Sequence, residues 1–227
     1  MADTVFIIGA GASKQAGVPL MAEFLDTAHD LWKLKKIRNG DQSFQEVFKG
    51  IGDLQQVHSK AQLDIHNVES VFAAFEMART IRQFAQYNEE QLNQLLRAMK
   101  TVIVNTIERT LHLPVEHMGQ QNKIRPAPPY EEFVNLLMEI MNKRRPTYRF
   151  AIITFNYDLA FDYAARFLFL PINYCLESNE RTDEIAFLKL HGSLNWVKCL
   201  GCQKIIPWHL DKYLSKYGWG DLYEQNH

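Results

Sequence analysis

Two hydrophobic periodicities alternate along the chain and divide it into strands and helices. Residues 4–8, TVFII, are β-branched and aromatic and run into Gly-Ala-Gly, which is typical of a buried strand entering a turn. Apolar residues at helical spacing follow over residues 20–34, and we expect Ser13 to cap this helix. Turn residues at 38–43 then end the pattern. The start of the chain therefore predicts one strand, a glycine turn and one helix.

The middle of the chain, from about residue 44 to 145, carries helical patterns and almost no strand signal. Asn67, followed by Glu69 and Ser70, is typical of a helix start, and Pro-Ala-Pro-Pro predicts a break before a helix that opens at Tyr130. Helical periodicity is found in residues 43–51, 67–86, 89–111 and 130–141. We expect residues 44–145 to form a helical insertion.

Strand patterns return in the last third of the chain, at residues 148–158, 172–176 and 186–193, with a helix at 158–168. Alternating strands and helices predict a parallel sheet, whose ligands bind beyond the carboxyl ends of its strands. The expected fold class is α/β, a Rossmann-like parallel sheet with a large helical insertion between its first and second strands. We expect this sheet to be truncated at its C-terminal end, near Asn226-His227.

Composition and charge fit one globular domain. The chain has 227 residues, of which 47% are hydrophobic and 22% charged, and a net charge of −1 gives no global attraction for nucleic acid or an anionic membrane. No apolar stretch reaches the roughly 18 residues of a membrane helix. Cys175, Cys199 and Cys202 are too few for a disulfide scaffold. We expect a cytoplasmic protein with no membrane and no direct nucleic-acid contact.

The glycine turn after the first strand is a candidate phosphate site. Its Gly-Ala-Gly at residues 9–11 lets backbone N–H groups point at a phosphate. Lys14 stands where a dinucleotide fingerprint has its third glycine, and Gly17 comes later than that pattern prescribes. Asp26 and Asp30 lie in a helix and not at the end of a second strand. These departures disfavour hydride transfer and leave phosphate binding and a purely structural turn as the alternatives.

The two later strands also run into polar residues. Asn156 and Asp158 follow one strand, and His191 and Ser193 follow another. Three strand ends with such residues can converge at one crevice of a parallel sheet. Taken singly, Asp158 is as well explained as a helix cap, Asn156 as a turn residue and His191 as a structural histidine.

Together, these segments resemble a known superfamily. GAGAS followed by AGVP, then TFNYD and LKLHGSLNW, resemble the sirtuin-like superfamily, and most closely its bacterial branch of NAD-consuming effectors in anti-phage defence. In the middle of the chain, NVESVF resembles a common helix start of the family's helical insertion. The resemblance covers residues 4–20 and about 148–202. It implies a Rossmann-type sheet that binds NAD for cleavage of the nicotinamide glycosidic bond, with nicotinamide and ADP-ribose as products, so that the enzyme is an NAD+ glycohydrolase.

The resemblance also implies roles for individual residues. The diphosphate is expected at Gly9, Ala10, Gly11, Ala12 and Ser13. Gly17 and Ser193 belong to the same NAD-binding set, and Asp158 is expected near the nicotinamide pocket. Asn156 is expected to orient the attacking water or a ribose hydroxyl, and His191 to act as general base. These residue types suit the reaction, because nicotinamide leaves as a neutral molecule and an imidazole accepts a proton near neutral pH.

Two departures separate this chain from protein-deacylating sirtuins. Their glycine turn is followed by an acidic-aromatic-arginine element, where this chain has residues 20–23, Leu-Met-Ala-Glu. They also carry Gln-Asn-Ile-Asp where residues 155–158 are Phe-Asn-Tyr-Asp. Both departures favour a hydrolase. An NAD-dependent protein deacylase and a non-catalytic module that binds NAD or ADP-ribose remain the alternatives.

A Cys-x-x-Cys pair marks a partial zinc knuckle at about residues 197–227. Cys199 and Cys202 supply two of the four ligands of a tetrahedral site, and His209 and His227 are the candidate substitutes for a second pair. Two free thiols in a reduced loop are the alternative, and the chain alone is not expected to bind zinc. We expect assembly as a homo-oligomer or with a sensor domain or partner protein.

Overall fold

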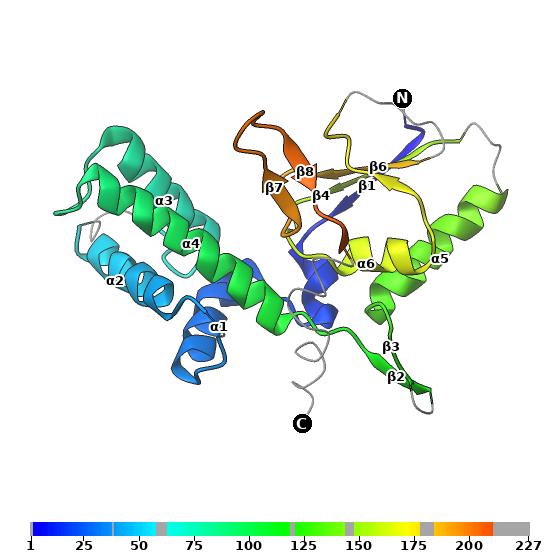
Figure 1. The fold of residues 1–227 in the computed structure, drawn as a ribbon, viewed down its shortest axis with the longest axis horizontal. Coiled ribbons are helices and arrows are strands. Elements are labelled where there is room, and N and C mark those ends of the chain that lie inside the picture. The colour runs from blue at the N-terminus through cyan, green and yellow to red at the C-terminus, as the bar shows by residue number, and fades with distance from the viewer. Residues whose placement is uncertain are drawn as a thin grey trace. The chain divides into compact units, whose positions relative to one another are not determined.

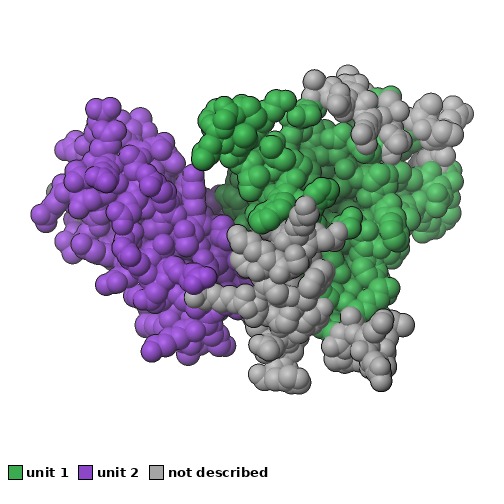
Figure 2. Space-filling view, viewed as in Figure 1, with its two compact units in different colours: residues 1–18, 111–227 green, residues 19–110 purple. Residues whose placement is uncertain are grey.

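The computed structural model describes residues 2–37, 39–57, 63–118, 121–143, 148–177 and 184–210. The chain divides into two compact units (Figure 2). One unit comprises Met1–Val18 and Leu111–His227 and contains the sheet, and the other is the helical unit Pro19–Thr110. Among the described residues, no helix is both long and apolar enough to cross a bilayer.

The sheet is parallel throughout, as the alternation of strand and helix patterns predicted (Figure 1). Its strands, in spatial order, are β1 (Thr4–Ile8), β4 (Phe150–Thr154), β6 (Ile185–Lys189) and β5 (Ile172–Asn173). Ile8 pairs in register with Thr154, and Thr154 with Lys189. The register therefore brings the carboxyl ends of β1, β4 and β6 level with one another. This is the α/β, Rossmann-like class that the sequence predicts.

Two helices, α5 (Pro128–Lys143) and α6 (Ala160–Phe167), cover one face of this sheet (Figure 1). Aromatic side chains form the contact: ring centroids are 5.3 Å apart for Phe6 and Phe133 and 4.7 Å apart for Phe161 and Phe187. On the opposite face, Ile7 of β1 keeps 72% of its surface exposed in the structure as described. Parallel sheets are normally buried on both faces, so the core of this unit lies on the side of α5 and α6.

The sheet unit also contains a short helix and two hairpins. The 3₁₀ helix η1 (Ala10–Ala16) begins inside the glycine turn, directly after Gly9. One hairpin pairs β2 (Val115–Met118) with β3 (Gln121–Ile124), and the other pairs β7 (Trp196–Lys198) with β8 (Ile205–Pro207). The β2–β3 hairpin corrects the expectation of helices alone over residues 44–145. Strands this short give no readable periodicity, and their pairing with each other forms the hairpin.

The helical unit consists of four helices: α1 (Met21–Lys33), α2 (Asp41–Val57), α3 (Val68–Ile81) and α4 (Glu89–Thr110). Helix α4 packs against the other three, and its buried apolar residues recur at helical spacing through Leu92, Leu96 and Met99. The Asn67 side chain caps α3 by accepting hydrogen bonds from the N–H groups of Glu69 and Ser70, as predicted.

The unit boundaries differ from the predicted insertion of about residues 44–145. Helix α1 belongs to the helical unit, because it packs against α4. Helix α5 belongs to the sheet unit, because Phe133 packs on Phe6 of β1. Helical periodicity identifies both helices but contains no information on which hydrophobic core each helix packs against.

Candidate functional site

The turns that follow β1, β4 and β6 lie side by side. Phe155 N–H donates to the carbonyl of Ile8 at 3.3 Å, and Leu190 N–H donates to the carbonyl of Thr154 at 2.9 Å. The turns after β4 and β6 therefore each donate a hydrogen bond to the last residue of the neighbouring strand, β1 and β4 respectively. The structure thus brings together the glycine turn, the segment containing Asn156 and the segment containing His191.

The Asn156 carboxamide is held by the glycine turn. Asn156 is 9% exposed, and its Nδ2 donates to the Gly9 carbonyl and to Ser13 Oγ, both at 3.0 Å. Its backbone N–H donates to Thr154 Oγ1 at 3.1 Å. No described residue donates a hydrogen bond to Asn156 Oδ1. This arrangement fixes the carboxamide and leaves its oxygen to accept a hydrogen bond from a ligand or water.

Ser13 links Asn156 to Asp158. Ser13 is fully buried, and its hydroxyl donates to Asp158 Oδ2 at 2.7 Å while lying 2.7 Å from the Tyr130 hydroxyl. The expected helix cap at Ser13 is therefore wrong: helix α1 begins at Met21 after Leu20, and the Ser13 side chain points instead into the network behind Asn156. A hydroxyl competes for any nearby partner, and here the partners come from the turn after β4 and from α5.

Asp158 is buried, with 4% of its surface exposed. Besides the bond from Ser13, its Oδ1 accepts a hydrogen bond from Ala160 N–H at 3.0 Å, so it also serves the first turn of α6 as a cap does. Burial raises the pKa of this carboxyl, although the nearby Lys189 ammonium acts in the opposite direction. Burial likewise raises the pKa of Tyr130. Asp158 thus contacts protein groups behind the site, and its expected contact with nicotinamide stays a prediction.

His191 lies on the exposed side of the site, just after β6. Its ring centroid is 5.3 Å from that of Phe155 and 5.6 Å from that of Tyr157, the two residues on either side of Asn156. Gly192 follows with φ at 89°, which turns the chain, and Leu194 N–H then donates to the Tyr157 carbonyl at 3.1 Å. The imidazole is thus held against the Asn156 segment and remains accessible to solvent.

The glycine turn is exposed to solvent, and one of its N–H groups, that of Ala12, donates to the Gly9 carbonyl at 3.1 Å. Gly9, Gly11 and Ala12 are exposed, and Ala10 is half-buried. A Cβ at Gly9 or Gly11 would meet no atom within 4 Å, and neither residue has a positive φ. Glycine is therefore not required at either position by packing or by backbone strain. Close approach of a ligand to the backbone remains as a reason for it.

Gly17 has a different explanation. It ends η1 with φ at 88°, in the left-handed region, and its N–H donates to the Lys14 carbonyl at 3.0 Å. The backbone geometry alone accounts for glycine at this position. Its predicted contact with NAD is not needed to explain the residue.

A set of buried polar atoms follows His191. Ser193 Oγ, Asn195 Oδ1 and Trp196 Nε1 are buried and find no hydrogen-bond partner among the described residues. Asn195 Nδ2 donates to the Trp208 carbonyl at 3.1 Å. A buried polar group without a partner costs about 1–3 kcal/mol of stability, which makes these three atoms unusual within the unit. The sequence analysis assigned Ser193 to the NAD-binding set and gave Asn195 and Trp196 no role, because the burial of their polar atoms is a property of the fold.

The Cys-x-x-Cys pair lies in the turn between β7 and β8. Cys199 N–H donates to the Lys204 carbonyl at 2.9 Å, and hydrogen bonds from the backbone of Cys202 and Gly201 lower the pKa of the Cys199 thiol. Within the described part of the chain, no three His, Cys, Asp or Glu side chains come together as metal ligands. His209 does not complete the pair, and His227 lies outside the described residues. The residues that the structure describes do not make up a tetrahedral zinc site.

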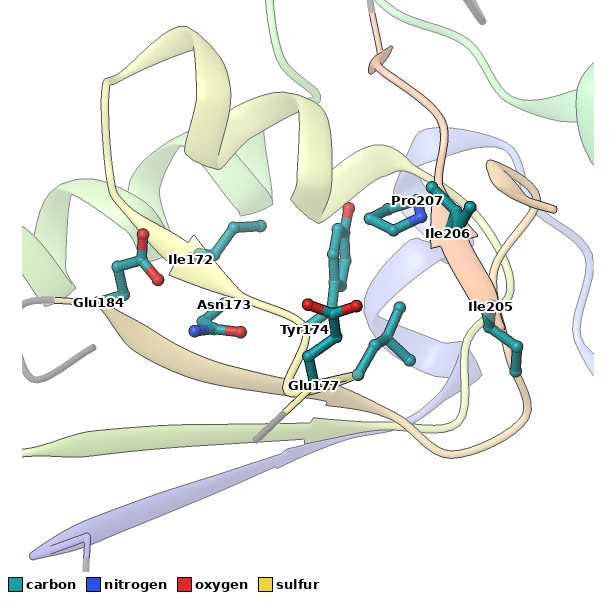
Figure 3. Close-up of a pocket in the computed structure, with 9 residues that line it drawn as sticks. Ile172, Asn173, Tyr174, Glu177, Glu184, Ile205, Ile206 and Pro207 are labelled. Atoms are coloured by element: carbon teal, nitrogen blue, oxygen red, sulfur yellow. The ribbon is translucent and has the colours of Figure 1, made fainter. Parts of the chain in front are cut away.

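A cavity of about 390 Å³ lies elsewhere in the sheet unit, beside β5 and β8 (Figure 3). It is lined by Ile172, Asn173, Tyr174, Leu176, Glu177, Glu184, Ile205, Ile206 and Pro207. None of the residues predicted for NAD binding or catalysis is among them. The candidate site and this cavity therefore lie in different parts of the sheet unit.

Two buried charged residues were also missed by the sequence reasoning. Lys189 ends β6 and Asp162 lies in α6, and they form an ion pair behind the Asn156 network. The signal that was available is one lysine within an otherwise apolar strand, FLKL.

Comparison of the sequence with protein-family models and with curated proteins gave no match.

Proposed function

We propose that this protein is a sirtuin-like NAD hydrolase that cleaves the bond between nicotinamide and ribose and releases nicotinamide and ADP-ribose. Its proposed role is that of a cytoplasmic effector of anti-phage defence that acts by depleting NAD. It works as a homo-oligomer or with a sensor domain or partner protein. The observation that carries the proposal is the placement of Asn156 and His191 on adjoining turns beside an open glycine turn.

The reaction makes limited demands on the protein. The nicotinamide ring leaves NAD as a neutral molecule, because the electron pair of the breaking C–N bond neutralises the pyridinium nitrogen. The protein must aim a water at the anomeric carbon and stabilise an oxocarbenium-like transition state. Asn156 Oδ1 accepts a hydrogen bond from that water or from a ribose hydroxyl. His191 accepts the proton that the water loses as its oxygen bonds to the anomeric carbon.

The surrounding residues support binding of the dinucleotide. The exposed turn at residues 9–11 suits the diphosphate, since neither glycine is required by packing. The Ala12 N–H is not part of this set, because it donates to the Gly9 carbonyl at 3.1 Å. The Ser193 hydroxyl, which lacks a partner among the described residues, suits a hydroxyl or amide group of the ligand. Ser13 and Asp158 hold Asn156 from behind. NAD is the substrate in this scheme, and no metal takes part.

The test is nicotinamide release from NAD by the purified protein, with Asn156→Ala and His191→Ala measured beside the wild type and no peptide present. Loss of the general base is expected to lower kcat by about 10²–10⁴-fold, and loss of the orienting carboxamide by about 10²–10³-fold. His112→Ala is the matched control, because His112 is exposed and lies outside the site.

Three results contradict the proposal. Wild-type protein that binds NAD and leaves it intact, with or without an acylated peptide, indicates a non-catalytic NAD-binding module. Turnover that requires an acyl-lysine peptide and transfers the acyl group to ADP-ribose indicates a deacylase. Hydrolysis that survives both substitutions places the active site elsewhere in the chain.

A further inference from the structure

Lys189 is a buried cation with two protein acceptors. Its Nζ donates to Asp162 Oδ2 at 2.9 Å and to the backbone carbonyl of Asp158 at 2.6 Å. The Lys189 and Asp162 side chains are 1% and 2% exposed. The Asp162 Oδ1 atom accepts a further hydrogen bond from the Tyr174 hydroxyl. Both charges are therefore neutralised inside the sheet unit, away from solvent.

Stability by itself gives no reason for a lysine here. Ile185 and Phe187, which precede Lys189 on the same side of β6, are buried apolar residues. An apolar side chain at position 189 would continue that core. Replacing a buried ion pair by apolar residues of similar volume is often neutral or stabilising, because desolvation of both charges offsets their attraction. Besides its ion pair with Asp162, Lys189 donates a hydrogen bond to the Asp158 carbonyl, and its charge favours the ionised form of the buried Asp158 carboxyl.

Two further hydrogen bonds connect Asp158 to Asn156. Ser13 Oγ donates a hydrogen bond to Asp158 Oδ2 at 2.7 Å and accepts one from Asn156 Nδ2 at 3.0 Å. A cavity of about 10 Å³ is lined by Lys189, Asp162, Asp158 and Asn156 together, so these groups surround one small space. Displacement of the Asp158 backbone would therefore reach the Asn156 carboxamide.

Lys189 is also close to His191 along the chain. Lys189 is the last residue of β6, and His191 follows two positions later, across a peptide whose N–H is bonded to Thr154. One side chain thus connects the strand that leads to His191 with the turn that contains Asn156.

We infer that Lys189, through its ion pair with Asp162, is a positioning residue that sets the Asn156 carboxamide relative to His191. This inference rests on the proposed hydrolysis for its effect on rate. It assigns Lys189 no contact with NAD, and so predicts an effect on kcat with little effect on KM. Misplacement of a catalytic group by about 1 Å is enough to cost on the order of 10²-fold in rate.

The test uses the double variant Lys189→Met/Asp162→Asn, which removes both charges and keeps the side-chain volumes. The Asp162→Asn change retains an oxygen for the Tyr174 hydroxyl. The matched control is Lys204→Met/Glu177→Gln, which removes an exposed pair of the same unit, with Nζ and Oε1 3.3 Å apart. Thermal unfolding, NAD hydrolysis and backbone hydrogen exchange are measured on both variants and on the wild type.

We expect the double variant to fold, with kcat lowered by about 10- to 100-fold, KM within about threefold of wild type, and faster amide exchange in residues 156–160. The control pair is expected to change none of these. An unchanged kcat, or exchange at residues 156–160 equal to wild type, overturns the inference. If the wild type hydrolyses no NAD, the proposed function fails by itself, and hydrogen exchange still decides whether Lys189 fixes the Asn156 turn.

Discussion

The side-chain amide of Asn156 donates a hydrogen bond to the backbone carbonyl of Gly9 at 3.0 Å, across 147 positions of sequence. The bond joins the turn after β4 to the turn after β1. It orients the carboxamide so that its nitrogen faces the glycine turn and its oxygen is the atom left for a ligand. The proposed catalytic amide and the proposed phosphate-binding turn are therefore one connected structure.

Ser13→Ala tests the link between these two turns. The substitution removes the donor to Asp158 and the acceptor for Asn156, and both groups are buried. We expect the free energy of unfolding to fall by about 1–3 kcal/mol, measured by urea denaturation, and nicotinamide release to fall with it.

Ser193→Ala is the control for that measurement. The Ser193 hydroxyl is buried and has no partner among the described residues, so its loss is expected to leave the free energy of unfolding unchanged or to raise it. Equal stability of Ser13→Ala and the wild type would show that the Ser13 hydrogen bonds contribute nothing in solution.

The buried carboxyl of Asp158 predicts a pH dependence of stability. Burial raises its pKa in the folded protein above the ordinary value of 3.8. The folded state therefore binds this proton more tightly than the unfolded state. The contribution of Asp158 to stability is fully present below pH 3.8 and is lost as pH rises through the folded pKa.

Asp158→Asn isolates this contribution, because the carboxamide has the same shape and does not ionise in this range. Urea denaturation of both proteins between about pH 4 and 8 is expected to show the variant gaining stability relative to the wild type as pH rises. A difference between the two proteins that is independent of pH would contradict a raised pKa at Asp158.

Alanine at Gly9 or Gly11 tests whether the glycine turn binds the diphosphate. A Cβ at either position meets nothing within 4 Å, and neither φ is positive, so stability is expected to stay the same or rise slightly. NAD binding, measured by calorimetry, is expected to weaken by about tenfold, the equivalent of one lost hydrogen bond.

Gly17→Ala should give the opposite pattern. Its φ of 88° is costly for any residue with a Cβ, so we expect a loss of roughly 1–2 kcal/mol in the free energy of unfolding. NAD affinity at a temperature where the variant is folded is expected to be that of the wild type. Unchanged NAD affinity in both Gly9→Ala and Gly11→Ala would show that the diphosphate does not bind at this turn.

Alkylation by iodoacetamide tests the Cys-x-x-Cys turn. Backbone hydrogen bonds from Cys202 and Gly201 lower the pKa of Cys199 below its ordinary value of 9.0, which raises its thiolate fraction near pH 7.5. We expect Cys199 to react faster than Cys175, an exposed free thiol, as followed by mass spectrometry of the labelled peptides. Slow labelling of Cys199 and Cys202 that a chelator accelerates would instead show a bound metal, completed by ligands outside the described residues.

Much of the local structure was predictable from the sequence. The β-branched run TVFII forms β1 over the predicted residues, and Asn67 caps α3 as its neighbours indicated. The strand expected at residues 172–176 is shorter, covering only Ile172–Asn173, because only these residues pair with β6. The β2–β3 hairpin was missed for a related reason, since strand pairing is a contact between segments and leaves little trace in either one.

The sequence by itself determined which residues end the strands of the sheet: glycines after β1, Asn156 after β4 and His191 after β6. Only the tertiary structure decided how these residues are used. It turned Ser13 from an expected helix cap into the partner of Asp158, 145 positions away, and it placed Lys189 beneath the Asn156 turn. Local propensity depends on neighbours along the chain, whereas the burial and pairing of a polar side chain depend on neighbours in space.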